Sequence, residues 1–208
     1  MTALPPQMHL PTGADPRQSH LLDAVREAFV EKGFDGASMQ DLARAAGISV
    51  GNFYRYFPSK DAIIEAIVMR DLADVQQEFA TIIQSDDPLT TLRGVLYHHI
   101  EGACGGDCPL MAEITAAARR KPQIGAVLRR LEDGIRGYLI AVFAAVTGLA
   151  LDESARRYGG HAALIMMLVK ANGMRVPAVD GNETDLNVQI LRTINRALDE
   201  IELDAVKG

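Results

Sequence analysis

The chain has 208 residues, of which 48% are hydrophobic and 23% are charged, so it is long enough to bury a substantial core. Its formal net charge of −6, taken alone, argues against a nucleic-acid binder. Its apolar runs are too short and interrupted to span a bilayer, and with two cysteines and no signal-peptide pattern the sequence predicts a cytoplasmic protein.

The first sixteen residues are rich in proline and contain no arginine or lysine. This composition predicts a disordered tail over residues 1–16. An arm that enters the minor groove of DNA needs basic side chains, so we do not expect that role here.

The rest of the chain has helical periodicity, which predicts an all-α fold of about nine helices. Leu22, Val25 and Phe29 mark a first helix over residues 17–32. Ser38, followed three residues later by Asp41, resembles a capping box at the start of a second, short helix.

A third short helix is predicted from Val50 to Tyr56, because Ser49 is a suitable N-cap and Pro58 prevents further extension. Ser59 should then cap a long fourth helix that connects this compact module to a larger helical region. In that region the pattern predicts helices over residues 89–104, 109–119, 122–147, 153–173 and 184–203.

The charge is distributed unevenly along the chain. Residues 17–60 contain six basic and five acidic residues, a local sum of 6 − 5 = +1, whereas the remaining chain is acidic. This asymmetry is typical of a DNA-binding module carried on an acidic body.

Two short helices joined at residues 47–49 have the form of a helix-turn-helix, in which Gly47 can adopt the positive φ that the turn needs. The second helix of such a pair enters the major groove. Asn52 can then pair with adenine, Val50 can contact a thymine methyl group, and Gly51 allows close backbone approach.

The aromatic residues of the third helix divide between two faces. Phe53 and Phe57 lie four residues apart and should pack inward. The remaining side chains carry hydroxyl or cationic groups that can bind phosphate oxygens. They are Tyr54, Arg55, Tyr56 and, at the start of the fourth helix, Lys60.

The segment "GFDGASMQDLARAAGISVGNFYRYFPSKDAIIEAIV", residues 33–68, resembles the DNA-binding domain of the TetR family of transcriptional regulators. The resemblance covers about residues 17–70. It implies an all-α homodimer with a DNA-binding domain over residues 17–60 and an effector-binding and dimerisation domain over residues 61–208, with the fourth helix as connector. It also implies a repressor that a small-molecule effector releases from a palindromic operator in double-stranded DNA.

The same resemblance assigns roles to individual positions. Family members place phosphate contacts at the positions of Ser38, Tyr54, Tyr56 and Lys60. The positions that contact bases or lie beside them are Gln40, Arg44, Val50, Gly51 and Asn52, with Ser49 and Arg55 completing the predicted DNA-binding set.

The two C-terminal helices are predicted to form the homodimer interface, as is usual in this family. The last helix carries an apolar stripe, and the preceding one carries small residues that permit close helix approach. The alternative is that the stripe belongs to the core of a single chain. Its residues are Leu186, Ile190, Ile194, Leu198 and Ile201.

An effector pocket is expected among the fifth to eighth helices, lined by flexible and aromatic side chains. Core packing or surface exposure is the alternative for each candidate. The candidates are Tyr97, His98, Met111, Tyr138, Phe143, Met166, Met167 and Lys170.

The segment "HHIEGACGGDC" raises the question of a metal or thiol site. Adjacent histidines on a helix point about 100° apart, and the spacing of Cys104 and Cys108 is not that of a usual zinc site, so we expect no metal and no cofactor. Thiol control through these cysteines, or a protein partner, remains an alternative to a small effector. The chain lacks a nucleophile elbow, a phosphate loop and an HExxH motif, so we expect no enzyme, and a Cys/His catalyst is the weakest alternative.

Overall fold

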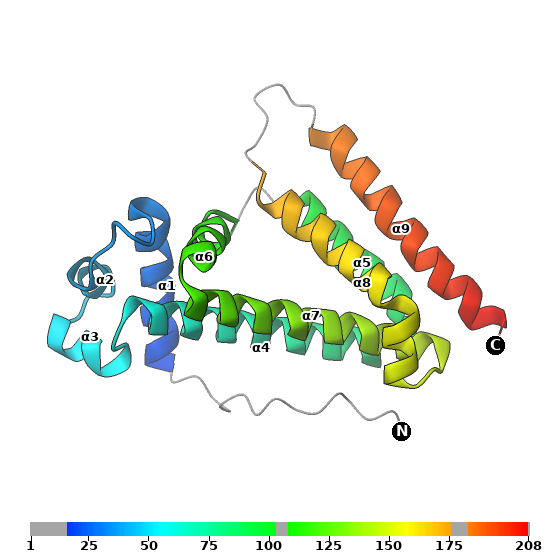
Figure 1. The fold of residues 1–208 in the computed structure, drawn as a ribbon, viewed down its shortest axis with the longest axis horizontal. Helices are drawn as coiled ribbons and strands as arrows, with labels where there is room; N and C mark the ends of the chain where they lie inside the picture. The colour runs from blue at the N-terminus through cyan, green and yellow to red at the C-terminus, as the bar shows by residue number, and fades with distance from the viewer. Residues whose placement is uncertain (1–15, 103–107, 176–182, 208) are drawn as a thin grey trace. The chain divides into compact units, whose positions relative to one another are not determined.

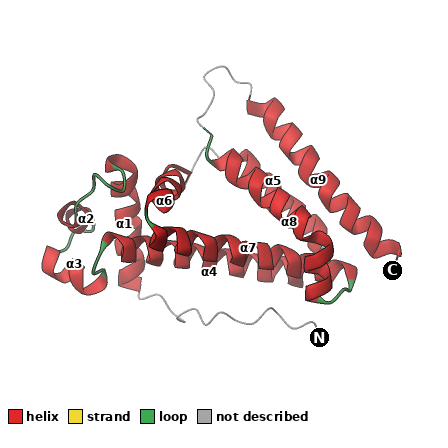
Figure 2. Ribbon diagram, in the orientation of Figure 1, coloured by secondary structure: helices red, strands yellow, loops and turns green. Residues whose placement is uncertain are grey.

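The computed structural model describes residues 16–102, 108–175 and 183–207, and within these ranges it consists of nine α-helices and their connections (Figure 2). This confirms the predicted fold class. The helices are α1 (Pro16–Lys32), α2 (Met39–Ala45), α3 (Val50–Tyr56), α4 (Lys60–Gln84), α5 (Pro88–Glu101), α6 (Cys108–Arg120), α7 (Pro122–Thr147), α8 (Leu151–Gly173) and α9 (Glu183–Lys207).

The short helices begin and end where local signals predict. Ser38 caps α2, and its capping box with Asp41 is complete in both directions. Ser49 caps α3 by accepting a hydrogen bond from the Asn52 backbone N–H. Phe57 ends α3 with an extended backbone (φ −135°, ψ 105°), as expected for the residue before a proline.

Two helix ends differ from the prediction by three residues or more. α5 ends at Glu101 rather than at residue 104, because Gly102 caps the helix through its N–H bond to the carbonyl of His98. α9 continues beyond residue 203 to Lys207, and Asp204 in this extra turn accepts hydrogen bonds from Arg157 and Tyr158 of α8. The predicted tail, except for Pro16 in α1, and the predicted break at Gly105-Gly106 lie outside the described residues.

The chain forms two compact units. The first contains α5, α8 and α9 with the second half of α4 and most of α7, over residues 74–108 and 132–208. Within it, α9 packs against both α5 and α8 (Figure 1). One continuous apolar core joins these helices, and its largest fully buried side chains are Phe143, Tyr158 and Ile82.

The second unit contains α1, α2, α3, the first half of α4, α6 and the start of α7, with boundaries at Ala73 and over Pro109–Leu131. Its core is built around aromatic pairs: the rings of Phe29 and Phe34 stack at 5.6 Å, and those of Phe53 and Phe57 lie 5.4 Å apart. All four side chains are buried, which confirms that Phe53 and Phe57 face inward. This packing fixes the orientation of the short helix α3.

Candidate nucleic-acid interface

The turn between α2 and α3 is closed by backbone geometry. Gly47 has φ +68°, which residues with a side chain adopt only with strain. The N–H of Ile48 donates to the carbonyl of Ala43 at 3.1 Å, and the Ser49 hydroxyl accepts from the Asn52 N–H at 3.3 Å. Ser49 therefore satisfies one of the backbone N–H groups at the N-terminal end of α3, directly after the sharp turn.

The face of α3 opposite the buried phenylalanines is exposed. Gly51, Asn52 and Arg55 are exposed, and Tyr54, a large and partly apolar residue, is 49% exposed. Val50 and Tyr56 are half-buried. The exposed residues supply an amide, a guanidinium and a phenol, which are groups that bind base edges and phosphates.

Helix α2, which precedes α3 in the chain, also carries exposed polar side chains. Gln40 and Arg44 are exposed, and the Arg44 side chain retains 77% of its accessible surface. The Ser38 hydroxyl is also exposed, although it takes part in the capping box. Because they are exposed, these side chains are accessible to a binding partner.

Asp41 organises the start of α2 electrostatically. Its carboxylate accepts a hydrogen bond from the Lys32 ammonium at 2.7 Å and from the Ser38 backbone N–H at 3.0 Å. The bond from Lys32, followed by those from Ser38, holds the pKa of this carboxyl well below its usual value. Asp41 is thus a structural acid within the candidate interface.

Lys60 is half-buried and, unlike the exposed residues of α3, its ammonium bonds to backbone groups of the protein. Its ammonium donates to the backbone carbonyls of Phe34, Ala37 and Asp35 at 2.7, 2.9 and 3.2 Å. Its predicted contact with a phosphate remains a prediction.

Sequence reasoning missed the residues that tie α6 and α7 to the α1–α2 turn. The Glu113 carboxylate accepts a hydrogen bond from the Phe34 backbone N–H at 2.9 Å. Arg120 pairs with Asp35 at 2.7 Å, and the Lys121 ammonium lies 4.3 Å from the centre of the Phe34 ring. The first two contacts join residues 79 and 85 positions apart, so no local pattern could have revealed them.

The predicted pocket residues differ in burial and belong to both compact units. Phe143 lies in the core of the first unit, Tyr138 and Met166 pack partly buried against that core, and Met111 belongs to the other unit. The ring of Tyr138 lies 5.7 Å from that of Phe79, and burial raises the pKa of its hydroxyl. The prediction that these residues bind an effector therefore stays a prediction.

The other predicted pocket residues have polar or exposed surroundings. Lys170 of α8 forms an ion pair with Glu132 of α7 at 2.5 Å, and both side chains are partly exposed. His98 is exposed, with its ring 5.8 Å from that of Tyr97. Tyr97 lines an open groove of about 480 Å³ between α5 and α9, together with Arg93, Gly94, Val188, Leu191, Arg192 and Asn195.

Cysteine chemistry lies beyond what the structure describes: Cys104 is outside the described residues, and only the backbone of Cys108 is placed, in α6. Across residues 16–102, 108–175 and 183–207, no cluster of His, Cys, Asp and Glu could hold a metal ion. No single helix in the same part of the chain is long and apolar enough to cross a membrane.

The apolar stripe of α9 is used inside the chain. Ile190, Ile194, Leu198 and Ile201 are buried in the core of the first unit, which is the alternative that the sequence left open, and Leu186 is exposed. An apolar face remains on α8 instead. It consists of residues at helical spacing that are all exposed: Gly160, Ala163, Met167, Ala171 and Met174.

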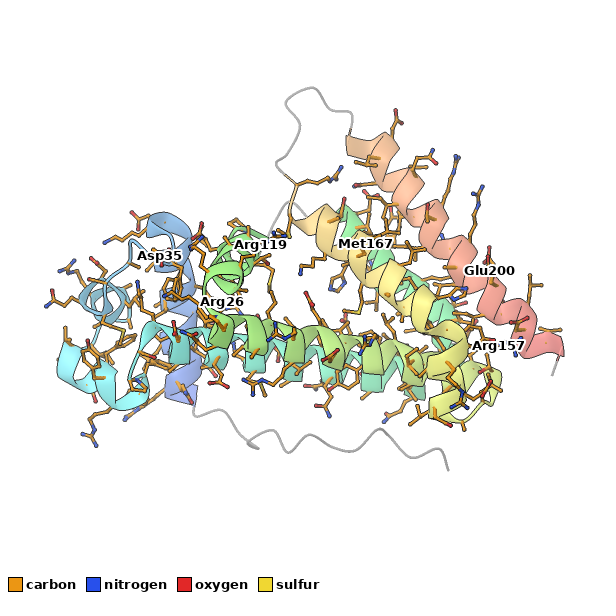
Figure 3. All side chains as sticks on the ribbon, in the orientation of Figure 1. Arg26, Asp35, Arg119, Arg157, Met167 and Glu200 are labelled. Carbon is orange, nitrogen blue, oxygen red and sulfur yellow. The ribbon has the colours of Figure 1, made fainter. Side chains whose placement is uncertain are left out.

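Met167 is the most prominent member of this α8 exposed face. Its side chain is 60% exposed and is labelled on α8 in Figure 3. At the other end of the helix, Arg157 and His161 form polar contacts with Asp204 and Glu200 of α9. These contacts join the two C-terminal helices within one chain and leave the α8 exposed face uncovered.

The segment that contains the candidate interface matches a known family of sequences. Residues 21–67 match the model of the bacterial regulatory proteins of the tetR family. The chain is 33% identical over 126 residues to the HTH-type transcriptional regulator UidR of Escherichia coli K12, which covers 58% of this chain and 61% of that protein. It is 31% identical over 93 residues to the HTH-type transcriptional repressor KstR2 of Rhodococcus jostii, which covers 44% of this chain and 46% of that protein.

Solved structures share the fold over nearly the whole chain. GusR of Salmonella enterica superposes with a TM-score of 0.67 at 23% identity, over 90% of this chain and 97% of that one. AibR, solved in complex with isovaleryl coenzyme A and operator DNA, superposes with a TM-score of 0.62 at 14% identity, over 86% of this chain and 97% of that one. At these identities the likeness establishes the fold alone.

Proposed function

We propose that this chain, whose residues 21–67 match the model of the bacterial regulatory proteins of the tetR family, is a DNA-binding transcriptional regulator, and specifically a repressor released from a palindromic operator by a small-molecule effector. The observation that carries the proposal is the two-faced helix α3. Its phenylalanines are buried in the core while Asn52, Tyr54 and Arg55 are exposed.

The residues proposed to contact DNA divide into two groups by chemistry. Val50, Gly51 and Asn52 begin the recognition helix, where residues come within reach of base edges in the major groove. Phosphates attract hydroxyl and cationic side chains, which orient the module without selecting sequence. The residues proposed for this positioning role are Ser38, Tyr54, Arg55 and Tyr56, whereas Gln40 and Arg44 are proposed to contact bases or lie beside them, with Ser49 completing the DNA-binding set.

A palindromic operator requires two copies of the chain, because each recognition helix reads one half-site. We place the homodimer contact on the α8 exposed face, with α9 beside it. Gly160 and Ala163 allow close approach of a second helix, and Met167 supplies an exposed apolar side chain to bury. The polar rim formed by Arg157 and Glu200 suits the edge of such an interface.

Release by an effector requires a contact that the effector can change. The α6–α7 corner provides one, because Glu113, Arg120 and Lys121 all contact the turn that precedes α2. The fold relative AibR was solved in complex with isovaleryl coenzyme A and operator DNA, so that protein binds both kinds of ligand. An effector that favours a shifted corner would lower operator affinity by its differential affinity for the two conformations.

The direct test is fluorescence anisotropy of the full chain with labelled duplexes from the DNA upstream of its own coding sequence. We expect a salt-sensitive complex with one preferred palindromic sequence, tighter than binding to scrambled DNA by 10³-fold or more, in the range typical of specific regulators. Equal affinity for operator and scrambled DNA at every salt concentration would reject the proposal.

The effector is tested on the same complex. A panel of metabolites is screened for compounds that raise the dissociation constant for the operator, and hits are measured by calorimetry with the free protein. The test variant is Glu113→Gln, which weakens the corner contact without replacing any residue of α3. We expect this variant to bind the operator while its response to the effector is reduced.

A further inference from the structure

Lys60 uses all of its hydrogen-bonding capacity inside the protein. An ammonium group has three donors and no acceptor. Three backbone carbonyl oxygens, those of Phe34, Ala37 and Asp35, lie 2.7, 2.9 and 3.2 Å from its nitrogen. A direct bond to a phosphate would therefore require the ammonium to give up at least one of these carbonyls.

The three acceptors belong to one short segment, the turn between α1 and α2. The turn opens at Gly33, whose φ is +72°, and residues 34–37 lie outside the regular helices that would otherwise satisfy their carbonyls. The Lys60 ammonium also lies 5.0 Å from the centre of the Phe34 ring, a cation–π distance. The turn is thus folded around a cation.

The turn determines where the reading helices begin. Ala37 is fully buried, and Ser38, the next residue, caps α2. The tight Gly47 turn joins α2 to α3, so a displaced turn at residues 34–37 displaces the start of both short helices. The Glu113 contact to the Phe34 N–H holds the same turn from α6.

We propose that Lys60 is a positioning residue that fixes the α1–α2 turn, and that its ammonium stays on the carbonyls of Phe34 and Ala37 when the chain is bound to DNA. Only the part of this proposal that concerns the DNA-bound state rests on the proposed function. Arg55 is a cationic residue exposed on α3, and it serves below as the control for Lys60.

The first experiment uses the free protein and needs no operator. Lysine ammonium groups labelled with ¹⁵N are observed by NMR, and Lys60→Arg assigns the Lys60 signal by its loss. We expect slow proton exchange and scalar couplings across hydrogen bonds to the carbonyl carbons of Phe34 and Ala37. A Lys60 ammonium that exchanges as fast as the solvent-exposed lysines, with no such couplings, overturns the proposal.

The same spectra with operator DNA test the bound state. We expect the couplings to the two carbonyls to persist. Their replacement by a coupling from the Lys60 nitrogen to a DNA phosphorus would overturn the proposal. A chain that binds no preferred DNA would defeat the proposed function, whereas the free-protein spectra would still decide whether Lys60 holds the turn.

The second experiment compares Lys60→Met, Lys60→Arg and Arg55→Met by thermal unfolding and by the salt dependence of operator affinity. A planar guanidinium cannot place three donors on three converging carbonyls, although it is an excellent phosphate ligand. We therefore expect both Lys60 variants to melt at lower temperature and to bind the operator at least tenfold more weakly, with an unchanged salt slope.

Arg55→Met is expected to lower the salt slope by about one while leaving the melting temperature unchanged, as the loss of a single phosphate contact does. The proposal is overturned if Lys60→Arg retains wild-type affinity and melting temperature while Lys60→Met lowers the salt slope by about one. If Lys60→Met does not fold, the Lys60→Arg data and the ammonium spectra decide the question.

Discussion

At the scale of single residues, Gly47 and Gly51 have different roles: the fold requires Gly47, whereas we propose that DNA binding requires Gly51. Both have open space where a Cβ would be, but only Gly47 has a positive φ. Gly47→Ala should destabilise the chain by about 1 kcal/mol or more because of backbone strain alone. Gly51→Ala should instead stabilise α3 by up to about 1 kcal/mol through helix propensity.

The two substitutions should also differ in operator affinity. Gly51→Ala adds a methyl group where we propose close backbone approach to the DNA, so we expect weaker binding in spite of higher stability. Chemical denaturation and anisotropy on both variants measure the two quantities separately. A Gly47→Ala protein as stable as the wild type would contradict the structural role of the turn.

Asn52 carries the most specific prediction at this scale. It is exposed near the start of α3 and its amide can pair with an adenine edge. Asn52→Ala should relax discrimination at one base pair in each half-site, by about 1–3 kcal/mol. Anisotropy with duplexes substituted one base pair at a time measures this effect.

Tyr54→Phe is the control for Asn52, because it removes an exposed hydroxyl proposed to contact a phosphate. It should weaken binding to all duplexes about equally. If Asn52→Ala lowers affinity for every duplex by the same factor, the side chain does not select a base and its proposed role is wrong.

At the scale of elements, two helix starts depend on ionised carboxylates. Bonds from Lys32 and then Ser38 lower the pKa of Asp41 in α2, and bonds from Thr90 lower the pKa of Asp87 in α5. A carboxyl with a lowered folded pKa stabilises the fold above its unfolded pKa, near 3.8, and loses this contribution as the pH falls below that value.

Hydrogen exchange between pH 5 and about pH 2.5 should therefore show acid-dependent loss of protection at the starts of α2 and α5. Asp41→Asn should remove the pH dependence at α2 alone, and Asp87→Asn should remove it at α5 alone, since asparagine does not titrate. Each variant is the control for the other. Equal pH dependence at α2 in Asp41→Asn and wild type would show that other groups cause it.

The same elements show what sequence can and cannot predict. The starts of α2 and α3 could be predicted because the signals, Ser38 with Asp41 and the N-cap residue Ser49, act within a few residues of the helix start. The contacts of Glu113 and Arg120 with the α1–α2 turn could not, because they depend on how distant segments pack. The turn around Lys60 was missed for the same reason: its lysine lies more than twenty residues from its carbonyls.

At the scale of the whole molecule, hydrophobic periodicity identified the buried stripe of α9 but not the chain that buries it. A stripe has the same spacing whether it faces its own subunit or a partner. The structure assigns Ile190, Ile194 and Leu198 to the chain's own core. For this reason we place the proposed homodimer contact on the face of α8 that the chain leaves exposed.

Met167→Asp tests this assignment. A carboxylate placed in the middle of an apolar interface must be desolvated when two copies associate, so we expect the dimer dissociation constant to rise by roughly a hundredfold. Sedimentation velocity over a dilution series measures the change. The variant should fold normally, because Met167 is 60% exposed in the single chain.

Tyr97→Asp is the matched control, since Tyr97 is also an exposed, largely apolar side chain but lies in the groove between α5 and α9. It should remain dimeric. The monomeric Met167→Asp protein should still bind an isolated half-site with its low intrinsic affinity, while its preference for the full palindrome over a half-site should fall to near one. A Met167→Asp protein that stays dimeric at wild-type concentrations would exclude α8 as the centre of the interface, because an unpaired carboxylate could not be buried there without cost.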